Sequence, residues 1–111
     1  MKLVTAVIKP LKLEEVCDAL ADIGVTGVTA LEAKGYGPHG HGEMHRTGGY
    51  DSRFLPRVKI EVAVTDDMVD RVVDTIIAAA HTGRVGDGKI FVLDLGQVVR
   101  IRTRETDAAA L

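Results

Sequence analysis

The chain has 111 residues, of which 46% are hydrophobic and 27% charged, and its formal net charge is −2. This length predicts one domain over 1–111 with a core of its own, and the absence of a positive excess argues against binding to nucleic acid or directly to an anionic membrane. No apolar run is long enough to span a membrane, the start MKLVTAVIKP is not laid out as a signal peptide, and the single cysteine, Cys17, suits a reducing compartment, so we expect a cytoplasmic protein.

The first part of the chain predicts a strand, a helix and a second strand. Apolar and β-branched residues fill 3–8 (LVTAVI), and Pro10 bounds this strand. Apolar side chains recur at helical spacing over 12–23, and Gly24 suits the position that follows a helix end. The run over 25–33 predicts the second strand.

A long loop is expected next, because GYGPHGHGEMHRTGGY (35–50) contains six glycines and three histidines but no apolar periodicity. The loop continues to about Arg53, which is far longer than the usual connection between two strands. Long irregular loops on a small rigid scaffold are usually either functional or disordered.

The pattern of strand, helix and strand then returns. Residues alternate with period two over 58–64, which predicts a third strand. Thr65 is a candidate N-cap, and Asp66 and Asp67 favour the first turn of a helix whose apolar stripe reaches Ala80. The following segments are expected to be a glycine-rich turn (82–88), a fourth strand (90–95), a short fifth strand (97–102) and a fraying tail (106–111).

This order of elements, βαβ followed by a loop, βαβ and an extra strand, predicts a ferredoxin-like α+β sandwich. Both helices would cover one face of an antiparallel sheet. The strands LVTAVI and IFVLDL are apolar on both faces, so the other face of the sheet would expose an apolar surface. We therefore expect a homo-oligomer whose sheets pack on one another.

The glycine-rich segment TGRVGDGKI (82–90) contains the letters of a phosphate loop, but Ile90 supplies no hydroxyl and a strand follows in place of a helix. The run Gly86, Asp87 and Gly88 could still present successive N–H groups to an anion, with Lys89 as a cation. The alternative is a plain turn between a helix and a strand.

Further cations alternate along two predicted strands, Arg57 with Lys59 and Arg100 with Arg102. Arginine suits phosphate oxygens because its guanidinium binds them in a bidentate manner. If these cations converge beside the glycine turn, a polyphosphate ligand is favoured, whereas the alternative is an exposed strand face.

Two interpretations of the histidines in the loop remain open. His39, His41 and His45 could ligate a metal ion with Glu43, or they could belong to a solvated loop. Tyr50 is either a surface tyrosine or a modification site presented to another enzyme.

Four stretches carry a resemblance over nearly the whole chain: MKLVTAVIKPLKLEEVCDAL, EAKGYG, FLPRVKIEVAV and HTGRVGDGKIFVLDLGQVVRIRTRE. They resemble the nitrogen-regulatory PII signal-transduction proteins. The resemblance implies a ferredoxin-like homotrimer in which ATP and ADP compete for one site in the clefts between subunits. It implies a regulator of a target protein, without catalytic turnover of its own.

The resemblance also assigns roles to residues. The loop over about 36–53 would be the flexible T-loop that docks on a target, such as an ammonium channel, another transporter, a metabolic enzyme or a kinase. In this loop Arg46 and Thr47 would contact the partner, and Tyr50 would be the residue that is uridylylated or adenylylated. The nucleotide site would comprise Thr29, Gly35, Gly37, His39, Arg57, Glu61, Ala63, Gly86, Asp87, Gly88, Lys89, Arg100 and Arg102.

The departures from the family pattern fall mainly in the loop. Pro38 and His39 replace the usual arginine and glutamine, and Arg57 replaces a lysine. These changes argue against 2-oxoglutarate sensing and leave His39 as the replacement ligand for Mg²⁺. An alternative function is therefore a PII-like regulator of metal or inorganic-carbon transport. A small phosphotransferase that uses a phosphohistidine is a second alternative, but no histidine falls on a rigid element beside an orienting carboxylate.

Overall fold

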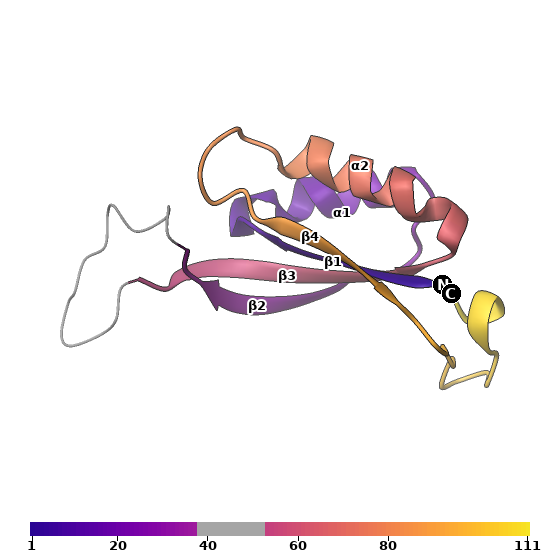
Figure 1. Cartoon of the computed structure of the whole chain (residues 1–111). Helices are drawn as coiled ribbons and strands as arrows, with labels where there is room; N and C mark the ends of the chain where they lie inside the picture. Colours follow the sequence, from indigo (N-terminus) through magenta and orange to yellow (C-terminus); the bar gives the residue numbers. More distant parts are fainter. Residues whose placement is uncertain (38–52) are drawn as a thin grey trace.

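The computed structural model describes residues 1–37 and 53–111, and it shows a four-stranded sheet with two helices on one face (Figure 1). The sheet is antiparallel with strand order β2-β3-β1-β4. This arrangement confirms the ferredoxin-like α+β fold. The elements in chain order are β1 (Lys2–Ile8), α1 (Leu13–Asp22), β2 (Thr29–Gly35), β3 (Leu55–Val64), α2 (Val69–Ala80) and β4 (Lys89–Asp94), with short 3₁₀ helices η1 (Pro10–Lys12), η2 (Asp66–Met68) and η3 (Asp107–Ala110).

Both α-helices are entered through a 3₁₀ turn. Pro10 begins η1, where its fixed φ is favourable and its missing N–H is not needed. Thr65 has the extended backbone of an N-cap before η2, but its side chain makes no capping hydrogen bond, so the predicted cap is only positional. Gly24 follows α1 at φ +93°, which confirms its role beyond the helix end.

The core lies between the helices and one face of the two central strands. In β3 the buried residues recur with period two, as the alternation predicts, and Ile60 at the centre is fully buried. The buried residues of each helix are four apart, so that apolar stripes meet an apolar sheet face. The core residues are Val4, Ala6, Ile8, Val16, Leu20, Val58, Ile60, Val62, Val64, Val72, Ile76 and Ala80.

The opposite face of the sheet has no helix over it. In the β1–β4 pairing, Leu3 faces Leu93 and Thr5 faces Phe91, out of phase with the buried Val4 and Ala6. Phe91 and Leu93 remain about half exposed, at 47% and 48%. The uncovered apolar surface that the sequence predicts is therefore present on β1 and β4.

The predicted fifth strand over 97–102 is not formed, and the prediction was wrong. Leu95 N donates to Met1 O at 3.1 Å, at the point where β1 begins, so the chain has no strand left to pair with beyond Asp94. The segment instead folds back through a single bridge between Val99 and Thr106. The tail after it forms η3, so the expectation of a fraying tail is also corrected.

The second strand begins at Thr29, four residues later than predicted, because 25–28 has no strand partner in β3. Among the described residues, no helix is long and apolar enough to cross a membrane.

Candidate functional site

The glycine-rich turn lies beside the end of the sheet where the long loop departs. There the end of β2, the start of β3 and the turn line a cleft of about 680 Å³, which we name the loop-end cleft. The pairing places Gly35 opposite Leu55 and Val7 opposite Lys89, so residues far apart in the sequence meet at this edge. Of the residues predicted for a nucleotide site, the structure brings together here Gly35, Gly37, Arg57, Gly86, Asp87, Gly88 and Lys89.

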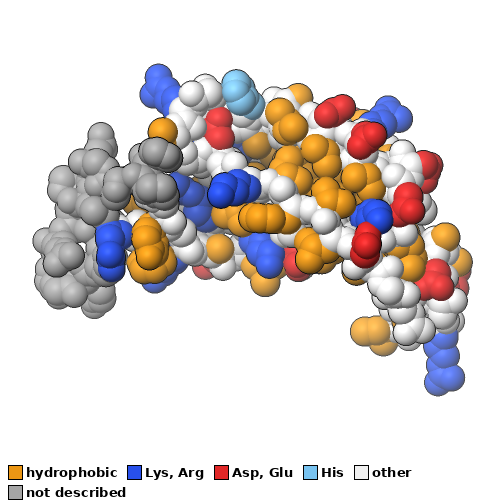
Figure 2. Space-filling model, in the orientation of Figure 1, with side chains coloured by type: hydrophobic (Ala, Val, Ile, Leu, Met, Phe, Trp, Pro, Cys, Tyr) orange, Lys and Arg blue, Asp and Glu red, His pale blue; other side chains and the backbone are white. Residues whose placement is uncertain are grey.

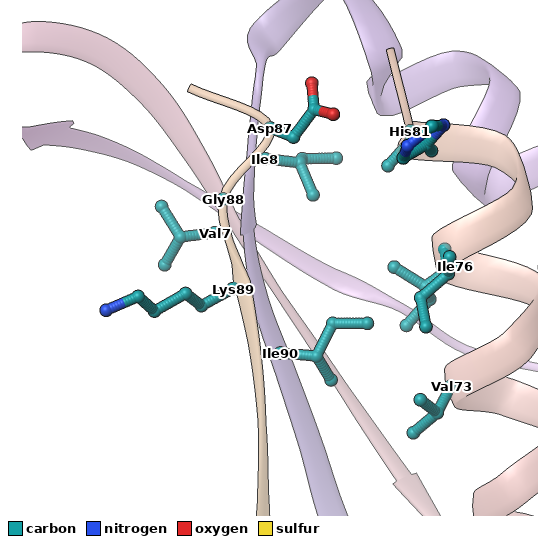
Figure 3. Close-up of a pocket in the computed structure, with 11 residues that line it drawn as sticks. Val7, Ile8, Val73, Ile76, His81, Asp87, Gly88, Lys89 and Ile90 are labelled. Atoms are coloured by element: carbon teal, nitrogen blue, oxygen red, sulfur yellow. The ribbon is translucent and has the colours of Figure 1, made fainter. Parts of the chain in front are cut away.

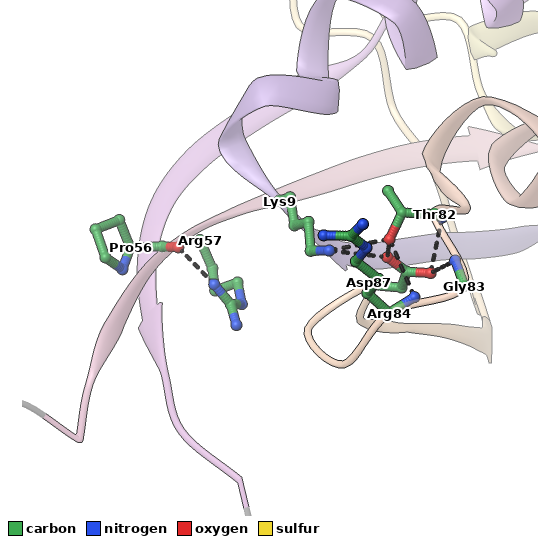
Figure 4. Close-up of polar contacts among 7 residues, drawn as sticks. All are labelled: Lys9, Pro56, Arg57, Thr82, Gly83, Arg84 and Asp87. Atoms are coloured by element: carbon green, nitrogen blue, oxygen red, sulfur yellow. Dashed lines mark hydrogen bonds and ion pairs between the residues drawn. The ribbon is translucent and has the colours of Figure 1, made fainter. Parts of the chain in front are cut away.

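The charges around the loop-end cleft suit an anionic ligand. Arg57, Arg84 and Lys89 line it, and Asp87 is the one acidic side chain among the described residues that line it. Arg57 is held by a 3.0 Å hydrogen bond from Nη1 to the carbonyl oxygen of Pro56 (Figure 4). The sequence reasoning did not single out Arg84, although a cation inside a glycine-rich turn is a visible signal.

Asp87 is engaged within its own turn. Its carboxylate accepts hydrogen bonds from the Thr82 hydroxyl, from Thr82 N at 2.8 Å and from Gly83 N at 2.9 Å (Figure 4). Lys9 Nζ lies 3.2 Å from the same carboxylate and 3.0 Å from the Thr82 hydroxyl oxygen. The hydrogen bond from the Thr82 hydroxyl, followed by that from its backbone N–H, holds the pKa of Asp87 well below its usual value. Asp87 and Lys9 therefore fix the shape of the turn, and nothing in the sequence pattern signals this role for Lys9.

Two glycines give the turn its path. Gly86 and Gly88 have φ of +99° and +96°, a region that favours glycine. A Cβ on Gly88 would lie 1.6 Å from the carbonyl oxygen of Val7, and one on Gly86 would lie 3.1 Å from Nη2 of Arg57. The backbone of the turn thus passes directly against β1 and against the cation beside it.

A second cleft, of about 630 Å³, lies at the opposite end of the sheet, and we name it the tail-end cleft. Its lining includes four of the residues predicted for a nucleotide site: Thr29, Glu61, Ala63 and Arg100. Thr29 pairs with Glu61 across β2 and β3. Arg57 and Ala63 are six residues apart on β3, which corresponds to about 20 Å along a strand. The predicted site residues are therefore divided between two ends of one chain.

The two late arginines do not lie on one strand face, which corrects the alternation inferred from the sequence. Arg100 is partly buried, and its Nη2 donates to the backbone oxygens of Ala110 and Leu111. Arg102 lies in the turn after the Val99 bridge and is exposed.

An aliphatic hollow of about 280 Å³ separates α2 from β4. Figure 3 shows Val73, Ile76 and Ile90 turned into it and the side chain of Lys89 turned away. In Figure 2, hydrophobic side chains gather in this region between the charged surface of α2 and β4. The hollow offers no arrangement of cations comparable with that of the loop-end cleft.

Several predicted residues lie outside the described residues, within 38–52: His39, His41, His45, Arg46, Thr47 and Tyr50. Across 1–37 and 53–111, no three His, Cys, Asp or Glu side chains come together as metal ligands. The carboxylate of Asp87 is already bound by Lys9 and Thr82, so the described part of the loop-end cleft does not form a metal site.

An aromatic pair marks the root of the long loop. The rings of Tyr36 and Phe54 meet edge to face with centroids 4.7 Å apart, and the Arg53 guanidinium lies 5.3 Å from the Tyr36 ring centroid. The pair holds the two strand extensions together just before the loop begins. The sequence reasoning did not identify it, because the two rings are 18 positions apart.

A ferredoxin-like sheet with a cleft at each end is the architecture expected of a PII signalling domain. The family model "Nitrogen regulatory protein P-II" matches residues 1–105, and the chain belongs to this family. It is a signal-transduction regulator of nitrogen metabolism. Proteins of this family bind nucleotides and interact with protein targets such as transporters and enzymes.

Individual relatives match over their full length. The chain is 56% identical to the nitrogen regulatory protein P-II of Klebsiella oxytoca and 55% identical to nitrogen regulatory protein GlnK of Escherichia coli K12. It is also 55% identical to nitrogen regulatory protein P-II 1 of the same strain. Each alignment spans 112 residues and covers all of both chains.

Proposed function

We propose that three copies of this chain assemble and bind ATP or ADP in the clefts between them. The observation that carries this proposal is the division of the predicted site residues between the loop-end cleft and the tail-end cleft of a single chain. Neither cleft alone contains the whole set. If the loop-end cleft of one copy faces the tail-end cleft of the next, each seam between subunits holds one complete site.

The side chains that line the two clefts suit different parts of a nucleotide. Arg57, Arg84 and Lys89 with the glycine turn suit the phosphates, because arginine and backbone N–H groups bind phosphate oxygens. Thr29, Glu61 and Ala63 offer polar atoms beside a small apolar surface, which suits the base and ribose. A volume of about 680 Å³ is within the range of small-molecule sites.

The nucleotide would act through the loop over 36–53. Gly37 and Arg57 line the loop-end cleft, and Tyr36 anchors the root of the loop against Phe54. ATP and ADP shift the loop only in so far as they differ in their contacts with these residues. To raise the fraction of molecules with the loop in one conformation from one in a hundred to ninety-nine in a hundred, the nucleotide must bind that conformation more tightly by about 5.5 kcal/mol. The reorganised loop would then dock on a transporter or an enzyme through Arg46, Thr47 and Tyr50.

Calorimetry tests the ligand. ATP and ADP are titrated into the purified protein, each with and without 2-oxoglutarate, and AMP serves as the matched ligand with fewer phosphates. We expect saturable binding of ATP and ADP in mutual competition, weaker binding of AMP, and no gain from 2-oxoglutarate. An absence of heat and of competition at millimolar ATP would refute the nucleotide proposal.

Mixing two variants tests whether the site spans two copies. Lys89→Ala damages the loop-end cleft, and Arg100→Ala damages the tail-end cleft. In co-refolded mixtures, the undamaged loop-end cleft of one variant can face the undamaged tail-end cleft of the other. We expect the mixture to regain sites of full ATP affinity that neither variant has alone. If the mixture binds ATP no better than the two variants measured separately, the site does not lie between copies.

A further inference from the structure

In the structure, Arg100 is hydrogen-bonded to the segment 107–111. Nη2 of Arg100 donates to the backbone oxygens of Ala110 and Leu111, both at 3.3 Å, in a partly buried setting. The segment 107–111 therefore satisfies a cation that the proposed function assigns to a nucleotide. Because both distances are long, these hydrogen bonds are weaker than a short bidentate contact with an anion.

The same segment is tied back to the chain at its start. Asp107 N donates to Val98 O at 2.7 Å, and Val98 N donates to Asp107 Oδ1 at 3.2 Å. Asp107 has a φ of +55°, a conformation that is uncommon for residues other than glycine, although aspartate tolerates it better than most. Beyond this tie, Ala108, Ala110 and Leu111 line the tail-end cleft beside Arg100.

We propose that the segment 107–111 is an autoinhibitory latch, which holds Arg100 in the absence of nucleotide and yields it to a phosphate. This inference rests on the proposed nucleotide site. A phosphate can bind the guanidinium in a bidentate manner through two charged oxygens, in place of two long hydrogen bonds from one nitrogen, so the exchange favours the ligand. The latch lowers the affinity for every phosphate-bearing ligand that uses Arg100.

The arrangement also explains why the latch opens without disturbing the fold. No residue of η3 is buried, so the segment itself contributes nothing to the core, and its release uncovers only the side of Val64 that faces the tail-end cleft. The Val99–Thr106 bridge precedes the latch and can remain in place while the segment moves. Arg102 has no comparable hydrogen bond in the described structure, which makes it the matched comparison for Arg100.

The test compares the full chain with a chain that ends at Thr106. The dissociation constants of ATP and of adenosine are measured by calorimetry. Loss of these two long hydrogen bonds predicts that the shortened chain binds ATP about three- to tenfold more tightly. The gain should be confined to ATP: adenosine has no phosphate for Arg100, and removal of Ala108, Ala110 and Leu111 from the tail-end cleft should leave its affinity equal or lower. The gain should persist in an Arg102→Ala background and vanish in an Arg100→Ala background.

A second measurement needs no shortened chain. Hydrogen exchange at the amide of Asp107 reports the bond to Val98 O, and ATP should accelerate it in the full-length protein. Slower exchange with ATP would overturn the latch.

The outcomes separate the two proposals. Equal ATP affinity of the long and short chains overturns the latch and leaves the nucleotide site intact, and weaker binding by the short chain overturns the latch because the segment then builds the site. If no variant binds ATP, both proposals fail together.

Discussion

At Gly88 the backbone of the glycine-rich turn passes so close to β1 that it leaves no space for a side chain. A Cβ there would lie 1.6 Å from Val7 O, which is backbone and cannot rotate away. The φ of +96° adds strain for any other residue. The sequence predicted a glycine turn and an anion nest here, but the contact with Val7 depends on the pairing of β1 with β4 and has no local signal.

Gly88→Ala should lower the free energy of unfolding by at least about 2–3 kcal/mol, because the turn must move away from β1 or strain its backbone. It should also weaken ATP binding, since Lys89 and Arg57 lose their fixed spacing. Gly96→Ala is the control, because Gly96 has no atom within 4 Å of an added Cβ and no positive φ. Urea unfolding at one protein concentration compares the stabilities of the Gly88→Ala and Gly96→Ala variants. Equal midpoints would contradict the close approach of the turn to β1.

At the scale of the element, the turn over 82–88 depends on one carboxylate. The folded-state pKa of Asp87 lies below its ordinary value of 3.8, chiefly because of the Thr82 hydrogen bonds. A group whose pKa is depressed by folding stabilises the fold above its unfolded pKa, and this contribution is lost as the pH falls below that value. The turn should therefore be well ordered at neutral pH and loosen in acid.

Asp87→Asn tests this dependence. The asparagine cannot pair with Lys9, and one of its two polar atoms is a donor facing the N–H groups of Thr82 and Gly83. We expect lower stability at pH 7 and a flatter decline of stability between about pH 4 and pH 2 than in the unchanged protein. Thermal melts over this range measure it, with Asp18→Asn on α1 as the comparison. Parallel pH profiles for the two aspartate variants would show that Asp87 does not have this role.

The helices and strands were predictable where the apolar face of an element packs on a core formed by the same chain. Period two over 58–64 and helical spacing up to Ala80 gave β3 and α2, because each buries one face on the same core. The prediction failed over 97–102, where alternation is present but β1 has already ended. The sequence did not decide whether Arg57 lies beside Gly86, because this depends on the order of strands in the sheet. The sequence also did not predict that Arg57 and Arg100 line different clefts of one chain.

At the scale of the whole molecule, the uncovered face of the sheet is an apolar surface that a second copy of the chain could bury. Leu93 and Phe91 are half exposed on edge strand β4, and the hydroxyl of Thr5 beside them is buried with no hydrogen-bond partner in the described structure. An unsatisfied hydroxyl is costly, but Thr5 Oγ1 is already inaccessible in the single chain and does not point to a partner. The half-exposed Phe91 and Leu93 are accounted for if a second copy covers this face.

Leu93→Glu should disrupt the assembly, because three like charges would be buried on apolar surfaces around one axis. We expect sedimentation velocity to show a shift from trimer toward monomer, and ATP binding to weaken in parallel, since each proposed site needs two copies. Leu11→Glu is the matched control, because Leu11 is 93% exposed in η1 on the opposite side of the molecule. A trimer that persists in Leu93→Glu with unchanged ATP affinity would place the contact between copies elsewhere. Loss of the trimer with ATP affinity retained would instead show that one chain binds the nucleotide alone.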